Sequence, residues 1–164
     1  MMKILLVTVL FSSCCIAQTN RKAFKLEIAA NETQQYVSDI DESPYFVKDK
    51  VLQIYCGESV FIECEITADS ISSMKVVEKN VNPKKTIEIK FHQENEDRKN
   101  IISMLEVKNP FNKDLIYEAI MLTPASKKWN STSIIPVRAN LVSFETWPHP
   151  IISLALMNWQ FKKA

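Results

Sequence analysis

Short runs in which apolar residues alternate with charged or polar residues constrain this chain most strongly. Successive side chains of a β-strand point to opposite faces, so a period of two predicts strands with one buried and one wet face. The clearest runs extend over Phe24–Ile28, Leu52–Cys56, Val60–Ile66 and Ile87–Phe91. Because the intervening positions are often charged, we expect antiparallel sheets with one face in water.

Weaker strand-like runs cover residues 74–79, 101–107, 115–122, 132–138 and 151–161. Asn, Pro, Asp and Lys cluster in the gaps between them, as in turns. No stretch repeats every 3.6 residues for long enough to form a major helix, and we expect at most one helical turn around Asn31–Val37. About eight or nine short strands predict an all-β fold, specifically an Ig-like antiparallel β-sandwich.

The last run, Ile151–Phe161, is apolar at both odd and even positions. This pattern is typical of a strand that is buried on both faces. We therefore expect it to be a central strand.

The N-terminus has the organisation of a secretory signal peptide. A short basic start is followed by an apolar run, Ile4–Phe11, and by small residues up to Ala17. The run is too short to cross a bilayer, which takes about 20 residues, and no later run approaches that length, so we expect no transmembrane helix. Cleavage after Ala17 would give an extracytoplasmic protein, either periplasmic or secreted.

A lipoprotein signal is the alternative for the N-terminus. Phe11–Cys14 resembles a weak lipobox, in which Cys14 would be lipidated and become the new N-terminal residue. The protein would then be anchored to the envelope by lipid, which is the only membrane attachment that we expect.

The rest of the chain is expected to form one domain, residues 24–164, preceded by a leader at residues 18–23. Residues 38–50 look like a surface loop. With 46% hydrophobic residues, the chain can bury a sizeable core. Its formal net charge of +1 provides no field to attract nucleic acid, so we expect no nucleic-acid partner.

Removal of residues 1–17 leaves two cysteines, Cys56 and Cys64. If a three-residue turn, Gly57–Ser59, joins the two runs as a hairpin, the thiols lie about 13 Å apart along the sheet. A disulfide needs Cα atoms within about 7 Å. This register predicts two buried free thiols. A wider loop over residues 57–63 would instead make a disulfide possible.

Few residues are candidates for metal binding, cofactor binding or catalysis. Two histidines, His92 and His149, lie far apart in the sequence, and we expect no metal site. A single glycine cannot supply a phosphate-binding or dinucleotide-binding loop, so we expect no cofactor and no enzyme activity. Glu63 and Glu65 are the best-paired carboxylates. We expect them to lie on a solvated strand face and not to act as the catalytic pair of a glycosidase.

The candidate binding surface has two parts. Tyr55 and Phe61 could join Glu63 and Glu65 in one patch, although packing within the sheet is the expected role of Tyr55. Trp147 and His149 lie in a turn bounded by prolines, where Trp147 either closes the end of the sandwich, which we favour, or is presented to a partner.

Two segments match the N-glycosylation sequon, namely Asn31–Thr33 and Asn130–Thr132. Only a eukaryotic secretory host would use them. The excess of lysine over arginine, 17 against 3, instead indicates an AT-rich bacterial genome.

Several segments resemble the strand-edge signatures of secreted bacterial β-sandwich proteins that are distantly similar to fibronectin-type or Ig-like modules. They are Tyr55–Val60, Asn109–Phe111 followed by Leu115 and Tyr117, Trp129 with Thr132–Ser133, and Trp147–Pro148. The resemblance covers most of the chain after residue 17 and implies a fold but no activity. The short spacing between Cys56 and Cys64 departs from antibody-type domains, whose disulfide joins two distant strands.

These features predict a non-catalytic extracytoplasmic binding module whose partner is another protein or an envelope component. The alternatives are a small secreted hydrolase or carbohydrate-active protein that uses Glu63 and Glu65, and a periplasmic immunity or inhibitor protein that acts through residues 145–150.

Overall fold

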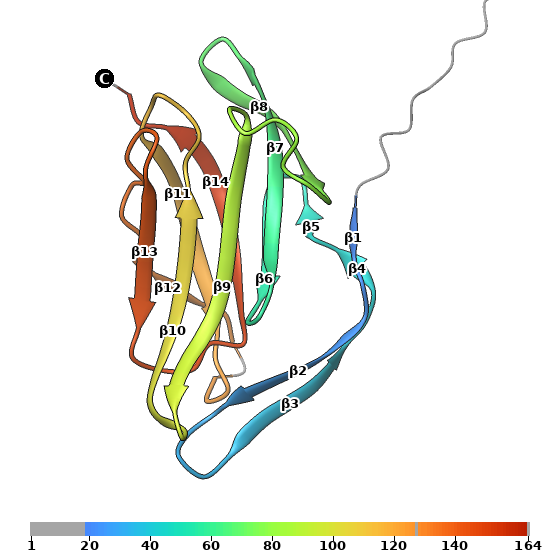
Figure 1. The fold of residues 1–164 in the computed structure, drawn as a ribbon, viewed down its shortest axis with the longest axis vertical. Helices are drawn as coiled ribbons and strands as arrows, with labels where there is room; N and C mark the ends of the chain where they lie inside the picture. Colours follow the sequence, from blue (N-terminus) through green and yellow to red (C-terminus); the bar gives the residue numbers. More distant parts are fainter. Residues whose placement is uncertain (1–18, 127, 164) are drawn as a thin grey trace, which may run out of the picture.

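A computed structural model describes residues 19–126 and 128–163. The expected signal peptide and Cys14 lie outside the described residues. Within the described residues the chain forms fourteen strands and no helix. Figure 1 shows two layers of strands side by side, with the hairpin of β2 and β3 running beneath one end of the layers.

Two five-stranded antiparallel sheets make up most of the fold. The β9 sheet has the order β13-β10-β9-β7-β8, and its strands are β7 (Ser59–Thr67), β8 (Ser70–Val77), β9 (Thr86–Glu96), β10 (Lys99–Lys108) and β13 (Val142–Trp147). The β14 sheet has the order β12-β11-β14-β6-β5, and its strands are β5 (Phe46–Lys48), β6 (Val51–Tyr55), β11 (Leu115–Leu122), β12 (Asn130–Thr132) and β14 (Ser153–Phe161). Two small pairs complete the structure, β2 (Phe24–Ala29) with β3 (Gln35–Ile40) and β1 (Asn20–Arg21) with β4 (Ser43–Pro44).

One hydrophobic core joins the two large sheets and the hairpin. Alternate residues of each sheet face this core, including Leu52 and Ile54 of β6 and Ile62 of β7, and all three are completely buried. Leu26 and Ile28 bring β2 into the same core. The expected all-β fold with antiparallel sheets is confirmed, and its architecture is that of a β-sandwich.

The region around Cys56 departs from the expected hairpin. Strands β6 and β7 belong to different sheets, so the chain crosses between the layers at Cys56–Glu58. Gly57 permits the crossing because its φ of 96° lies in a region that favours glycine. Its N–H donates to the Phe91 carbonyl (2.8 Å), and the Phe91 N–H donates back to the Glu58 carbonyl (2.9 Å).

Cys56 and Cys64 are both free and buried. The expectation of free thiols is therefore confirmed, although the hairpin register from which it came is wrong. Burial raises the pKa of both thiols to about 12, which keeps them protonated and unreactive near neutral pH.

The helical turn expected around Asn31–Val37 is wrong. The Asn31 side-chain oxygen accepts the backbone N–H groups of Thr33 (2.9 Å) and Gln34 (2.8 Å). This Asx turn joins β2 to β3 without a helix, because the Gln34 carbonyl accepts the N–H groups of Ala30 (2.9 Å) and Asn31 (3.2 Å) and so closes a hairpin.

The chain makes its other tight turns without glycine, because Gly57 is its only one. Two hairpin turns have consecutive residues with positive φ, Ala68–Asp69 between β7 and β8 and Asp97–Arg98 between β9 and β10. This conformation belongs to type I′ turns, in which Asp tolerates the left-handed region better than most residues. Asp and Asn therefore take much of the role that glycine usually has.

The C-terminal part of the sandwich differs from the expectation at one strand. The expected strand 132–138 is short, since β12 ends at Thr132 and beyond it only Val137 makes a bridge, to Leu115. Pro136 has no N–H to donate, so the run cannot continue as a regular ladder. Strand β13, which none of the expected runs covers, follows at Val142.

Strand β14 is central, as expected, with β11 on one side and β6 on the other. Its first four residues, Ser153–Leu156, are buried on both faces, whereas Asn158 and Gln160 point to solvent. Asn158 has a φ of 57° within a β-bulge opposite β11. The expectation of burial on both faces holds for the first half of the strand.

We predict that a chain ending at Pro150 shows no cooperative thermal unfolding. The truncation removes five large buried side chains, Ile151, Ile152, Leu154, Leu156 and Trp159. Each contributes about 1.5–3 kcal/mol, so their sum is comparable to a typical net stability of about 5–15 kcal/mol. A graded test is Leu156→Ala, which should lower the free energy of unfolding by about 2–5 kcal/mol, against less than about 0.5 kcal/mol for the exposed Gln160→Ala. A cooperative transition in the truncated chain near that of the full chain would contradict this role for β14.

Candidate functional site

The most strongly constrained polar group is the Arg21 guanidinium, which is 1% exposed. Its Nε and Nη2 donate to the two carboxylate oxygens of Glu58 at 2.7 Å and 3.0 Å, as a bidentate pair. Nη2 also donates to the Gln53 carbonyl (2.7 Å), and Nη1 donates to the Ser43 hydroxyl (3.1 Å). These partners come from β6, from β4 and from the crossing between the two sheets.

Two tyrosine rings enclose the same guanidinium. Arg21 lies 4.6 Å from the ring centre of Tyr45 and 4.8 Å from that of Tyr55, which is the geometry of cation–π contacts. The Tyr55 ring also packs edge-on against Phe24. Tyr55 is therefore used for packing, as expected. The segment 19–23, which was expected to be a leader, contains the buried Arg21 and so is attached to the domain.

The remaining members of the expected patch lie elsewhere. Phe61, Glu63 and Glu65 are on β7 of the β9 sheet, whereas Tyr55 is on β6 of the β14 sheet. The four residues therefore do not share one face.

Both carboxylates of β7 are paired with lysines. Glu63 is buried and bonds Lys75 Nζ (2.8 Å) and Asn82 Nδ2 (2.5 Å), while the exposed Glu65 lies 3.2 Å from Lys85 Nζ. The hydrogen bond from Lys75, followed by that from Asn82, holds the pKa of Glu63 below its ordinary value of 4.5. A general acid needs a raised pKa, so Glu63 is tuned in the opposite direction.

Trp147 lies in the core, as favoured, and its indole Nε1 donates to the Thr132 hydroxyl (2.8 Å). His149 is half-buried in the loop that follows β13. The Ser103 hydroxyl donates to the His149 carbonyl (2.9 Å) and accepts the Ile151 N–H (3.0 Å), which holds this loop on β10. The turn therefore places only His149 and its prolines at the surface.

His149 borders an end groove, formed by two adjoining cavities of about 510 Å³ and 360 Å³. Both cavities are lined by Ala30, His149 and Pro150, and Asn31 and Arg98 line the larger one. The groove lies where the hairpin of β2 and β3 meets the loops at one end of the sandwich, a position typical of binding loops.

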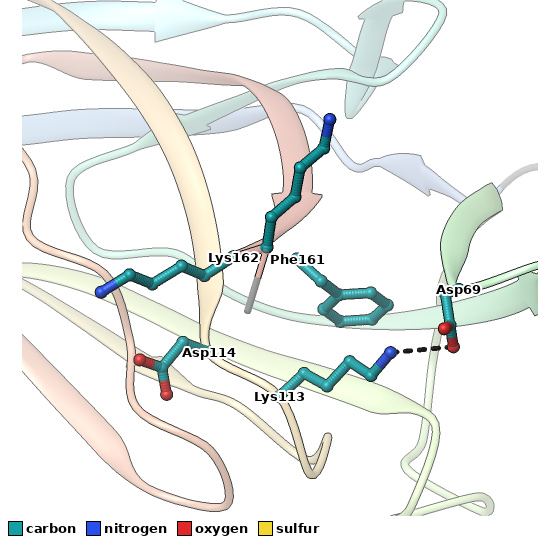
Figure 2. Close-up of a pocket in the computed structure, with 6 residues that line it drawn as sticks. Asp69, Lys113, Asp114, Phe161 and Lys162 are labelled. Atoms are coloured by element: carbon teal, nitrogen blue, oxygen red, sulfur yellow. Dashed lines mark ion pairs between the residues drawn. The ribbon is translucent and has the colours of Figure 1, made fainter.

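A cavity of about 600 Å³ lies beside the end of β14. Figure 2 shows the Phe161 ring there, with Lys113 extending past it to Asp69, and the amino groups of the lysines pointing in different directions. The ion pair between Lys113 and Asp69 is 2.8 Å long and exposed. Because the cations do not converge, they do not form one anion site.

Four exposed apolar side chains lie on β13 or in the segment before it. We call Ile135, Leu141, Val142 and Phe144 the β13 edge patch; these side chains are between 40% and 62% exposed. The Ile135 N–H donates to the Glu145 carboxylate of β13 (2.8 Å), which keeps the segment before β13 beside it. Val142 and Phe144 alternate along the strand, a period-two signal that could have identified a strand here.

We predict that Arg21→Met lowers the free energy of unfolding by about 3–5 kcal/mol, because it leaves the buried Glu58 carboxylate without its partner. The matched control is Arg138→Met. Arg138 is 74% exposed and 3.4 Å from Asp114, so its loss should cost about 0–1 kcal/mol. Denaturant unfolding of both variants measures the difference, and equal small losses would show that Arg21 is not an anchor.

The lowered pKa of Glu63 predicts a pH dependence of stability. The ionised carboxylate stabilises the fold at pH above its unfolded pKa, and this contribution is lost as the pH falls through the lower folded pKa. Between about pH 5 and about pH 3, the wild type should lose more stability than Glu63→Gln. Lys75→Met should also lose less stability than the wild type over this pH range. An identical dependence of stability on pH in all three proteins would show that Glu63 does not cause it.

The described residues contain no cluster of three or more His, Cys, Asp or Glu side chains that could hold a metal ion. Among residues 19–126 and 128–163, no helix is long and apolar enough to cross a membrane. Comparisons with known protein families, with curated proteins and with solved structures find no match to this chain.

Proposed function

We propose that this protein is a non-catalytic extracytoplasmic binding module that docks another protein, or a protein of the envelope, through the β13 edge patch. The observation that carries the proposal is the exposure of Val142 and Phe144 on β13, the last strand of the β9 sheet, together with that of Ile135 and Leu141 in the segment before it. Exposed apolar patches with a polar rim are typical of protein interaction sites.

The surroundings of the patch fit this role. Val142 is opposite Lys108 on β10, and Lys108 forms an ion pair with Glu88 of β9 (2.8 Å). Phe144 is opposite Glu106, so charged groups border the apolar side chains along the sheet. An apolar centre beside a charged rim is the usual anatomy of an interface.

The edge itself offers a second means of binding. Strand β13 has β10 as its neighbour on one side and no strand on the other side among the described residues. Residues 141–147 contain no Lys, Arg or Pro, which natural proteins place on edge strands to prevent pairing. An extended segment of a partner can therefore add to the sheet, with backbone hydrogen bonds for affinity and Phe144 for specificity.

The proposal includes the extracytoplasmic location and the Ig-like type of the sandwich. The N-terminal pattern up to Ala17 supports export to an extracytoplasmic compartment. Two antiparallel sheets joined by crossings such as that between β6 and β7 support an Ig-like sandwich.

The geometry does not favour the two alternatives. The Glu63 carboxylate is paired with Lys75 and has a lowered pKa, which does not suit a hydrolase acid. An inhibitor acting through residues 145–150 would present Trp147, but this ring is in the core. An inhibitor that binds its target by the β13 edge patch would be one form of the proposed function.

We predict that Phe144→Lys abolishes partner capture. A lysine in the centre of the patch would have to be desolvated on binding, which costs more than the lost apolar contact. Purified wild-type protein, Phe144→Lys and the control Val81→Lys are immobilised and exposed to the same extract of envelope and secreted proteins. Val81 is 72% exposed and lies outside the patch, so it adds the same charge elsewhere.

The expected result is a protein that is retained by the wild type and by Val81→Lys but lost with Phe144→Lys, while all three unfold at similar temperatures. Retention of the same proteins by Phe144→Lys, or capture of none by the wild type, would contradict the proposal.

A further inference from the structure

The open edge of β13 presents the backbone groups of every second residue. The Asn109 N–H donates to the Leu141 carbonyl (2.9 Å), where the pairing of β10 with β13 begins. Hydrogen-bonded pairs recur at every second residue of an antiparallel ladder, so the backbone of Glu145 bonds β10 as well. The N–H and C=O groups of Val142 and Phe144 therefore point away from β10, toward the side on which the described residues place no further strand (Figure 1).

The Glu145 side chain lies on the core side of this edge. Glu145 is opposite Leu105 of β10, which is completely buried, and directly opposed residues share a face of the sheet. Burial, and then the negative charge of Glu145, raise the pKa of Tyr117 of β11, whose buried hydroxyl has no hydrogen-bond partner among the described residues. The half-buried carboxylate is therefore close to the interior, where water screens a charge less than at an exposed surface.

No lysine or arginine among residues 19–126 and 128–163 forms an ion pair with Glu145. Its Oε1 accepts the Ile135 N–H (2.8 Å), which is a neutral donor. Three other carboxylates of the β9 sheet each pair with a lysine, namely those of Glu63, Glu65 and Glu88. Glu145 thus brings a negative charge without a cation to the edge along which an added strand would lie.

We propose that β13 binds an extended antiparallel segment in which a Lys or Arg is followed, at the first and third positions after it, by apolar residues. The inference rests on the proposed function, because it names the partner of the β13 edge patch. In a strand added to this edge, the residue opposite Glu145 would form a non-hydrogen-bonded pair, in which side chains are closest. The next residue and the third residue would lie opposite Phe144 and Val142 on the other face.

The charge of Glu145 also discriminates against other strands. An inward-pointing charge on an edge strand opposes indiscriminate pairing, because an apolar strand would cover the carboxylate without compensating it. A second copy of β13 does not fit, since residues 141–147 contain no Lys or Arg to place opposite Glu145. The edge therefore selects its partner by repulsion as well as by attraction.

The test uses the full chain and two fluorescently labelled peptides. One peptide has the order Thr-Thr-Lys-Val-Thr-Val-Thr, and the other has Glu in place of Lys. Fluorescence anisotropy measures their binding to the wild type, Glu145→Gln, Glu145→Lys and the control Glu106→Gln. Glu106 is opposite Phe144 and so lies on the other face of the sheet, where its variant removes the same charge away from the added base.

We expect the wild type to bind the Lys peptide about 5-fold more tightly than the Glu peptide, because opposite charges across a strand pair stabilise it and like charges destabilise it. Glu145→Gln should remove this preference, Glu145→Lys should reverse it, and Glu106→Gln should keep it. The Lys peptide should also slow hydrogen exchange at the amides of Val142 and Phe144, which would become bonded to the added strand.

Equal affinity of the wild type for the two peptides, no measurable binding of the Lys peptide, or binding that leaves the Val142 and Phe144 amides unprotected would overturn the inference. The proposed function is tested separately, by capture from an extract with Phe144→Lys. A partner retained by the wild type and lost with Phe144→Lys, together with any of these peptide results, would reject the inference and leave the proposed function in place.

Discussion

The buried ion pair between Arg21 and Glu58 holds together parts of the chain that no regular ladder connects. Glu58 lies at the crossing between the two large sheets, and its second carboxylate oxygen also accepts the Tyr55 N–H (2.7 Å). A charged pair is costly to bury unless its hydrogen bonds are satisfied, and here the Gln53 carbonyl and the Ser43 hydroxyl satisfy the guanidinium. The interaction therefore fixes the first described strand, the crossing and strand β6 of the β14 sheet in one arrangement.

The alternation of apolar residues was enough to predict the fold class and most strands, because burial of one face requires a period of two. It could not show which strands are neighbours, since a run such as Val60–Ile66 has the same pattern in either sheet. For this reason Leu52–Cys56 and Val60–Ile66 were placed in a hairpin, whereas Gly57 directs the chain to the opposite layer. The expected helical turn failed because the Asn31 side chain closes a hairpin there.

The residues of the candidate site were harder to predict, because their surroundings come from distant parts of the sequence. Arg21 is buried by a partner 37 residues away, and no local pattern distinguishes it from an exposed arginine in a leader. Trp147 was correctly expected in the core, because a turn with two prolines follows it before a strongly apolar strand. Phe144 was missed although Val142 and Phe144 alternate, since period two identifies a strand but not whether it lies at the edge of a sheet.

The crossing and the ion pair between Arg21 and Glu58 should form one cooperative unit with the sandwich. Native-state hydrogen exchange tests this most directly, at the amides of Tyr55, Gly57 and Phe91, whose acceptors are the Glu58 carboxylate, the Phe91 carbonyl and the Glu58 carbonyl. We predict that all three exchange only through global unfolding, with the same free energy and denaturant dependence as the core amides of β14. Exchange through a local opening of much lower free energy would contradict the account.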